Sequence, residues 1–148
     1  MRVSILRIFA GKVLLLVSVF LFSSSLGSVA AEQDVEAIAV AAAEEFLILV
    51  DQGEYVKSWE QASSLFAERI PKEQWVEGIS RFRPMFGAIK QRTLKGSHLA
   101  KNLPGATSGE YVLILFTSVF ELKDSAVETI TMMRDVDGQW RAAGYYIE

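Results

Sequence analysis

The sequence predicts an α+β domain in which three N-terminal helices pack on a bent four-stranded antiparallel sheet. Apolar residues recur at helical spacing as far as Phe86, and strand-like runs replace this pattern from about Ile89 onward. Turn signals at 103–105, 123–125 and 137–138 divide the second half into four strands with short connections. Helices in one block followed by strands in the next are typical of the α+β class.

The helical half contains signals for three helices. We expect the first over 34–51, ending at Gly53, because glycine readily adopts the left-handed conformation found after a helix. The second is expected over 54–69. Pro71 suits the first position of the third helix, where its missing N–H costs nothing. Pro84 lies inside the apolar pattern of that helix and should kink or end it.

The strand half predicts strands over 89–101, 111–120, 127–134 and 139–147. The first is polar and basic, as is common for an edge strand. The second is apolar on both faces, so we expect it to be central and covered on both sides. Because helices can cover only one face, we predict that a second copy of the chain covers the other, as a possible homodimer through the sheet face.

The N-terminal segment 1–31 has the order of a secretory signal peptide. Its only charges are basic and precede the apolar run 13–22, and small residues follow. We expect cleavage after Ala30 or Ala31, which leaves a single domain of residues 32–148 in the periplasm or secreted from the cell. The alternative is a retained N-terminal membrane anchor. The uncharged stretch is only marginally long enough for this, because a spanning helix needs roughly 20 predominantly apolar residues.

Composition excludes several classes of function. Three of the fifteen basic residues lie in the signal, so the domain has twelve against eighteen acids, a net charge of −6 that is unsuited to nucleic acid. There is no cysteine, hence no disulfide. We interpret His98, the single histidine, as a surface residue, and we expect no metal, no cofactor and no phosphate-binding loop.

Several segments together are specific for a family: 46–59, 73–75 with 83–87, 103–105, 109–112, 127–129, 137–141 and 144–147. Over essentially all of 35–148 they resemble a bacterial secreted family catalogued as domain of unknown function 4019. The resemblance implies a nuclear transport factor 2-like (cystatin-like) fold, which agrees with the layout above and typically encloses a conical cavity. That fold hosts isomerases, dehydratases and many non-enzymes, so it does not imply an activity. The family supplies no catalytic residues to transfer.

One carboxylate is a catalytic candidate. Glu128 lies among apolar and threonine residues of a predicted strand. If it faces the interior, it is suited to general acid–base catalysis. The alternative is that it faces solvent or pairs across the sheet with Arg141 or Arg92.

Aromatic residues with polar tips are candidates for an apolar binding pocket: Tyr55, Trp59, Trp75 and Tyr145. The alternative is that they form the ordinary core.

Basic residues gather between positions 78 and 109, where no acid occurs: Arg81, Arg83, Lys90, Arg92 and Lys95 are the main members. They suggest a patch for an anionic partner such as a lipid head group or a cell-wall polymer. The alternative is an edge strand protected by positive charge that also complements the acidic helices.

These observations leave three hypotheses for function. The first is an exported, non-catalytic domain that binds a small apolar ligand or a protein partner in the cell envelope. The second is an enzyme of the isomerase or dehydratase kind with Glu128 as its base. The third is an assembly or inhibitory module that presents its sheet edge. The missing catalytic constellation favours the first hypothesis over the second.

Overall fold

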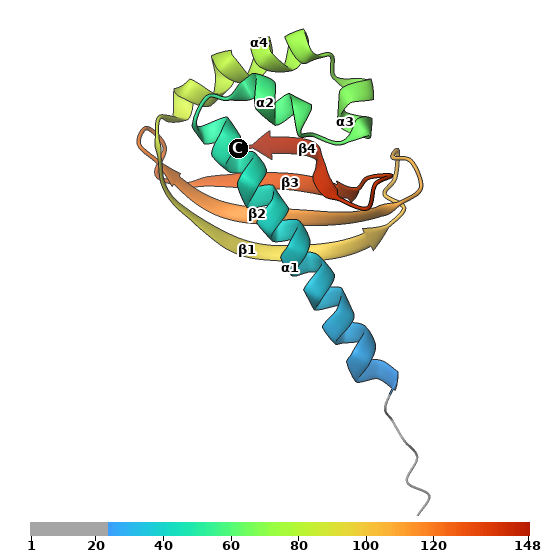
Figure 1. Ribbon diagram of the computed structural model, residues 1–148. Coiled ribbons are helices and arrows are strands. Elements are labelled where there is room, and N and C mark those ends of the chain that lie inside the picture. Colours follow the sequence, from blue (N-terminus) through green and yellow to red (C-terminus); the bar gives the residue numbers. More distant parts are fainter. Residues whose placement is uncertain (1–23) are drawn as a thin grey trace, which may run out of the picture.

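The computed structural model describes residues 24–148, and in these it has one antiparallel sheet with the helices packed on one face (Figure 1). The predicted α+β class is therefore confirmed, with four helices in place of three. In chain order the elements are α1 (Ser24–Asp51), α2 (Tyr55–Glu60), α3 (Ser64–Arg69), α4 (Lys72–Phe82), the 3-10 turn η1 (Arg83–Phe86), β1 (Ile89–Lys101), β2 (Glu110–Phe120), β3 (Ala126–Arg134) and β4 (Trp140–Ile147).

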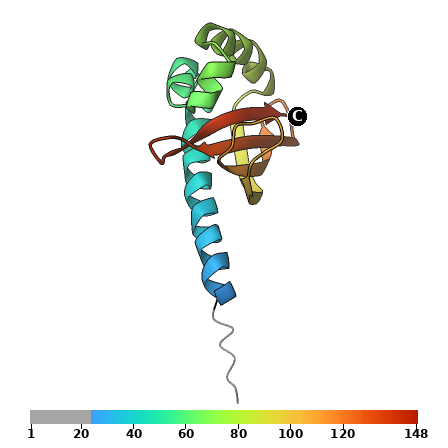
Figure 2. The ribbon, with the colours of Figure 1, turned by 90° about the vertical axis from the view of Figure 1, so that its right-hand side faces the viewer.

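The helices differ from expectation at two points. Helix α1 begins at Ser24, ten residues earlier than expected, and its first turns project beyond the sheet (Figures 1 and 2). The prediction of one helix over 54–69 is wrong, because Ser63 caps a new helix. Its side-chain oxygen accepts the Phe66 amide at 3.2 Å, so the chain leaves α2 and restarts as α3.

The third expected helix corresponds to α4. Pro71 occupies its N-cap and not its first helical position. At the other end Pro84 converts the last turn to η1, and Gly87 then leaves the helical direction with φ +74°. Proline removes the N–H that a continuing α-helix needs, so the expected end of the helix is reproduced.

The sheet is a meander in the order β1-β2-β3-β4, so β1 and β4 are its edges. The strand boundaries agree with the predicted ones to within one residue. Strand β1 has register shifts at Lys90 and Lys95, each of which adds one residue opposite β2. Such bulges bend and twist a strand, which helps β1 to curve around α1 (Figure 1).

The core lies between the helices and the inner face of the sheet. It is formed mainly by α1, α4 and alternate residues of β2 and β3, including Phe46, Leu47, Trp75, Val112, Ile114, Phe116, Ile130 and Met132.

The outer face of β2 is only half covered. Its side chains Leu113, Leu115 and Val119 are partly exposed, and only the Tyr111 end is buried, beneath the 102–109 loop. The apolar sequence of β2 predicted that both faces are covered along the whole strand. The described residues alone do not provide this coverage.

Within residues 24–148 no helix is both long and apolar enough to cross a membrane. The predicted signal peptide lies largely outside the described residues.

Candidate functional site

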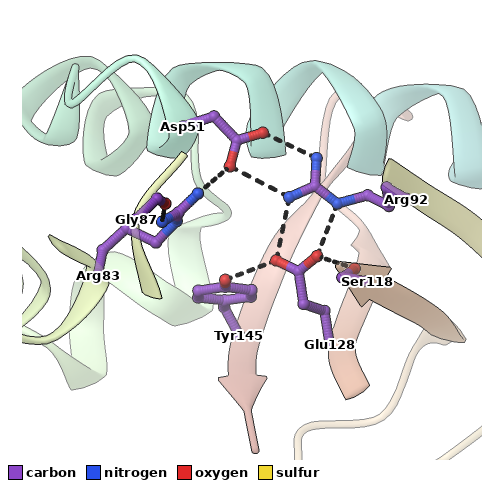
Figure 3. A network of polar contacts seen from close by, with 7 residues as sticks. All are labelled: Asp51, Arg83, Gly87, Arg92, Ser118, Glu128 and Tyr145. Atoms are coloured by element: carbon purple, nitrogen blue, oxygen red, sulfur yellow. Dashed lines mark hydrogen bonds and ion pairs between the residues drawn. The ribbon is translucent and has the colours of Figure 1, made fainter. Parts of the chain in front are cut away.

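Four charged side chains meet inside the fold beside the C-terminal end of α1 (Figure 3). Asp51 comes from α1, Arg83 from η1, Arg92 from β1 and Glu128 from β3. The ion pairs of the cluster join residues that lie 32 to 41 positions apart, so it exists only in the folded chain. We refer to these residues, with Ser118 and Tyr145, as the buried polar network.

Arg92 is the centre of the buried polar network. Its Nε and Nη2 donate to the two carboxylate oxygens of Glu128 at 2.6 and 3.1 Å. Its Nη1 and Nη2 donate to Asp51 at 2.8 and 3.1 Å. A planar guanidinium that binds two carboxylates through paired hydrogen bonds is the strongest arrangement of this kind. Burial alone lowers the pKa of Arg92, but these hydrogen bonds outweigh it and raise the pKa above its usual value.

Arg83 is the second cation of the network. Its Nη2 donates to Asp51 at 2.9 Å and its Nη1 to the Gly87 carbonyl at 2.6 Å. The Arg83 guanidinium lies 4.5 Å from the ring centre of Phe120, which is a favourable cation–π contact. The Nε atom of Arg83 has no hydrogen-bond partner among the described residues. Two arginines thus balance two carboxylates, and the cluster is neutral as a whole.

Glu128 has no exposed surface and lies on the inner face of β3. Besides Arg92, the Ser118 hydroxyl and the Tyr145 hydroxyl donate to it, the latter at 2.7 Å. Four donors occupy the roughly four lone-pair positions of a carboxylate. Burial and the charge of Glu128 raise the pKa of Tyr145, so its proton stays on the phenol. A general base needs a free lone pair within reach of a substrate, and this geometry offers none.

The predicted basic patch is divided by the fold. Arg83, at 4% exposure, and Arg92 belong to the buried polar network, so they are not part of a surface. Arg81, Lys90 and Lys95 are exposed, and Arg81 pairs with Glu77. The Arg92–Glu128 pairing is one of the alternatives that the sequence left open; Arg141 instead pairs with Asp137 in the β3–β4 hairpin.

A groove between α4 and β4 is the second candidate site. It has a volume of about 320 Å³ and a mainly apolar lining: Ile70, Gln74, Trp75, Gly78, Ile79, Phe82, Tyr145, Tyr146 and Ile147. Helical spacing places Gln74, Gly78 and Phe82 in one row along α4. A Cβ at Gly78 would meet no atom within 4 Å, so this residue leaves the wall of the groove open.

The groove brings together two of the four predicted binding aromatics, Trp75 and Tyr145, but not Tyr55 or Trp59. Three of the four polar tips are used inside the protein. Trp59 donates to the Ile70 carbonyl at 2.7 Å, Trp75 to the Ser58 hydroxyl at 3.0 Å, and Tyr145 to Glu128. The ring surfaces of Trp75 and Tyr145 that remain for the groove are therefore apolar.

Some residues of both sites were missed from the sequence. Asp51 follows an apolar helix face and Ser118 lies in an apolar strand, and an isolated polar residue in an apolar run is a weak signal for a buried network. Gly78 and Phe82 carried no signal for a groove. His98 is exposed on β1, and no group of three or more metal-ligating side chains occurs among residues 24–148.

Comparison with known proteins gives a family. The model of the family described as "Protein of unknown function (DUF4019)" matches residues 42–145. The chain belongs to this family. No curated protein matches it. A solved structure described as "2.5 Angstrom structure of from Catenulispora Acidiphila" is similar over 84% of this chain and 93% of that chain, with 12% identity and a TM-score of 0.44.

Removing the central cation should destabilise this DUF4019 domain strongly. Arg92→Met keeps much of the side-chain volume but leaves Glu128 buried with no arginine partner. Breaking one side of a buried ion pair costs about 3–5 kcal/mol. We expect a loss of that size in the free energy of unfolding, measured by urea titration with tryptophan fluorescence.

The matched control is Arg81→Met, which breaks the exposed pair of Arg81 with Glu77 on α4. Exposed pairs contribute about 0–1 kcal/mol, so this variant should unfold close to the wild type. Equal unfolding midpoints for the two variants would contradict the structural importance of the network.

Proposed function

We propose that this DUF4019 domain is a non-catalytic binding protein that takes an apolar ligand or an apolar segment of a partner in the groove between α4 and β4. The observation that carries the proposal is the groove itself, with its open wall at Gly78 and the ring surfaces of Trp75 and Tyr145. Its volume, about 320 Å³, lies at the lower end of the range for ligand pockets, about 300–1,000 Å³.

The isomerase or dehydratase alternative has less support. It requires a substrate at Glu128, which is fully buried, accepts hydrogen bonds from Arg92, Ser118 and Tyr145, and is not among the residues that line the groove. A substrate would have to displace Arg92, whose positive charge stabilises the Glu128 carboxylate.

We further propose that the domain is exported and that its fold is of the nuclear transport factor 2-like type. Export is supported by the charge and size order of residues 1–31. The described residues add that 29–34 are exposed and that the first buried side chain of α1 is Ala39. Cleavage after Ala30 or Ala31 would therefore remove none of the residues described as buried. A helical layer on a curved four-stranded sheet supports the fold assignment (Figure 1).

The partly exposed outer sheet face supports a homodimer as a second proposal. Leu113, Leu115 and Val119 lie on this face of β2, and Val127 adds to it from β3. Burying adjoining apolar side chains against a second copy would remove them from water, which favours association.

Export is tested by the mass of the protein purified from its native cells. We expect an intact mass corresponding to a chain that begins at Ala31 or Glu32. A mass that includes residues 1–31 would contradict cleavage and favour the retained anchor.

The dimer is tested by sedimentation equilibrium of residues 32–148. We expect a dimer at high micromolar concentration and a monomer for Leu115→Lys, because a charge at the centre of the face would be costly to bury. A strict monomer of the wild type would contradict the proposal.

Groove binding is tested with the neutral apolar dye Nile red. We expect the dye to bind the wild type and to bind Gly78→Phe at least tenfold more weakly, because the new ring occupies open space in the groove. Phenylalanine is a better helix former than glycine, so the variant should still fold. Dye binding is measured by its fluorescence emission.

The control is Gly78→Ala, which adds only a methyl group to the wall of the groove. It should bind Nile red nearly as well as the wild type and be more stable by about 0.8–1 kcal/mol, from helix propensity. Unchanged dye binding by Gly78→Phe would contradict the groove as the binding site.

A further inference from the structure

We propose that the protein has a second binding site, around Trp140, which takes a neutral saccharide chain. The site lies between α1, the end of α2 and the hairpin that joins β3 to β4, which crosses α1 (Figure 2). It shares no lining residue with the α4–β4 groove, so the two sites are separate on the molecule.

Two cavities meet at Trp140. One has a volume of about 310 Å³ and lies between α1, the end of α2 and the start of β4; the other, of about 320 Å³, lies between α1 and the hairpin. Both are lined by Ala42 and Glu45 of α1 and by Gln139 and Trp140 on the hairpin side. Each cavity is at the lower end of the range for ligand pockets, about 300–1,000 Å³. Because the cavities meet along these residues, a chain of several sugar rings can occupy both.

The hairpin fixes the position of Trp140. Asp137 and Gly138 reverse the chain, with Gly138 at φ +81°, and the Asp135 amide donates to the Gln139 carbonyl at 2.8 Å. Trp140 then begins β4 in register with β3. Its side chain packs against the main core but is only partly buried. An aromatic ring is therefore held in place at the surface, with part of it open to the cavities.

Trp140 differs from the other two tryptophans in its indole N–H. The N–H groups of Trp59 and Trp75 donate inside the protein, to the Ile70 carbonyl and the Ser58 hydroxyl. The indole N–H of Trp140 has no hydrogen-bond partner in the part of the chain that the structure describes. The ring thus offers a ligand an apolar face and one free donor at its edge. A sugar ring matches this pair, because it has a face of C–H groups and an edge of hydroxyl groups.

Three lining side chains also have no hydrogen-bond or ion-pair partner within residues 24–148: Glu45, Gln61 and Gln139. All three are exposed. A carboxylate accepts hydrogen bonds, and an amide both accepts and donates. Hydroxyl groups do both as well, so neighbouring hydroxyls of a sugar can pair with each of these side chains. In contrast to the groove, the lining here is more polar than apolar.

The cations of the lining are already neutralised. Arg141 donates to both carboxylate oxygens of Asp137 at 2.6 Å and also lies 3.6 Å from Asp135. Arg134 donates to Glu110 at 2.9 Å. An anionic ligand would have to break these pairs to reach a positive charge, so the site disfavours anions.

The carboxylates of the lining disfavour further classes of ligand. Glu60 pairs with Lys72 at 2.8 Å, which leaves Glu45 as the one lining charge without a partner among the residues described. An ammonium ligand would pair with Glu45 but offers only donors, so the indole N–H of Trp140 would stay unpaired. An apolar ligand would cover these polar groups without pairing them, which is costly. A neutral ligand with an apolar face and many hydroxyls meets every one of these conditions.

The first test uses the indole N–H signals of residues 32–148 in a proton–nitrogen NMR correlation spectrum. The chain has three tryptophans, so the spectrum has three such signals. We expect at least one of cellotriose, maltotriose and chitotriose to shift the Trp140 signal until it saturates, while the signals of Trp59 and Trp75 change little. No shift of the Trp140 signal by any of the three at millimolar concentration would overturn the proposal.

The second test compares two neighbouring acids of α1. Glu45 lines both cavities, whereas Glu44 lines neither, and both side chains are exposed. We expect Glu45→Ala to bind the trisaccharide at least fivefold more weakly, because the variant loses an acceptor for hydroxyl groups. Glu44→Ala should bind like the wild type, and its effect on helix propensity is the same. Equal affinities of the two variants would overturn the proposal.

The third test concerns the length of the saccharide. Because the two cavities meet at Trp140, we expect the trisaccharide to bind at least tenfold more tightly than its own monosaccharide. Equal affinity would show that one ring fills the site and would overturn the assignment to a saccharide chain.

Other outcomes identify a different ligand or a different site. A shift of the Trp140 signal by spermidine or by citrate, but by no saccharide, would assign the site to a charged ligand and overturn the proposal. Gly78→Phe should leave saccharide binding unchanged, because the groove and this site share no lining residue. Loss of both Nile red and saccharide binding in Gly78→Phe would overturn the proposal of two separate sites. If the wild type binds no Nile red but the trisaccharide still shifts the Trp140 signal, the proposed function of the groove is wrong and the saccharide site is supported.

Discussion

The guanidinium of Arg92 is the interaction on which the arrangement of the fold depends. It joins the end of α1, through Asp51, to the middle of the sheet, through Glu128. Asp51 in turn holds Arg83 of η1. Neither carboxylate would be stable in this position without its arginine partner, since a buried charge is tolerated only when it is paired and hydrogen-bonded. The network therefore determines where α1, η1 and the sheet meet.

That junction also shapes the groove. The segment η1 follows α4 directly, so the anchoring of Arg83 to Asp51 and to the Gly87 carbonyl fixes the C-terminal end of α4. Tyr145 belongs to both features: its hydroxyl donates to Glu128 while its ring lines the groove. The buried polar network thus holds the α4 wall of the groove, and pairing with β3 holds the β4 wall. The surface of the groove is mainly apolar.

The local sequence predicted most of the elements and little of the site. The change of period near Ile89 and the turn at 137–138 gave the strands because side-chain alternation is a local property. The break at Ser63 was missed, since a serine within an apolar pattern marks a helix start only when its side chain reaches the backbone amide of Phe66. Trp75 and Tyr145 line one groove, whereas Tyr55 and Trp59, which were grouped with them on residue type alone, do not line it.

By itself the sequence determined the α+β order and the family. It contained the arginines and the carboxylates without specifying their partners, so Arg83 and Arg92 resembled surface charges beside Lys90. Tertiary structure alone decided that these arginines are buried, that Glu128 is enclosed by donors, and that residues of α4 and β4 line one groove. The physical reason is that periodicity is set by neighbours in the chain, whereas ion pairing and grooves are set by which distant elements meet.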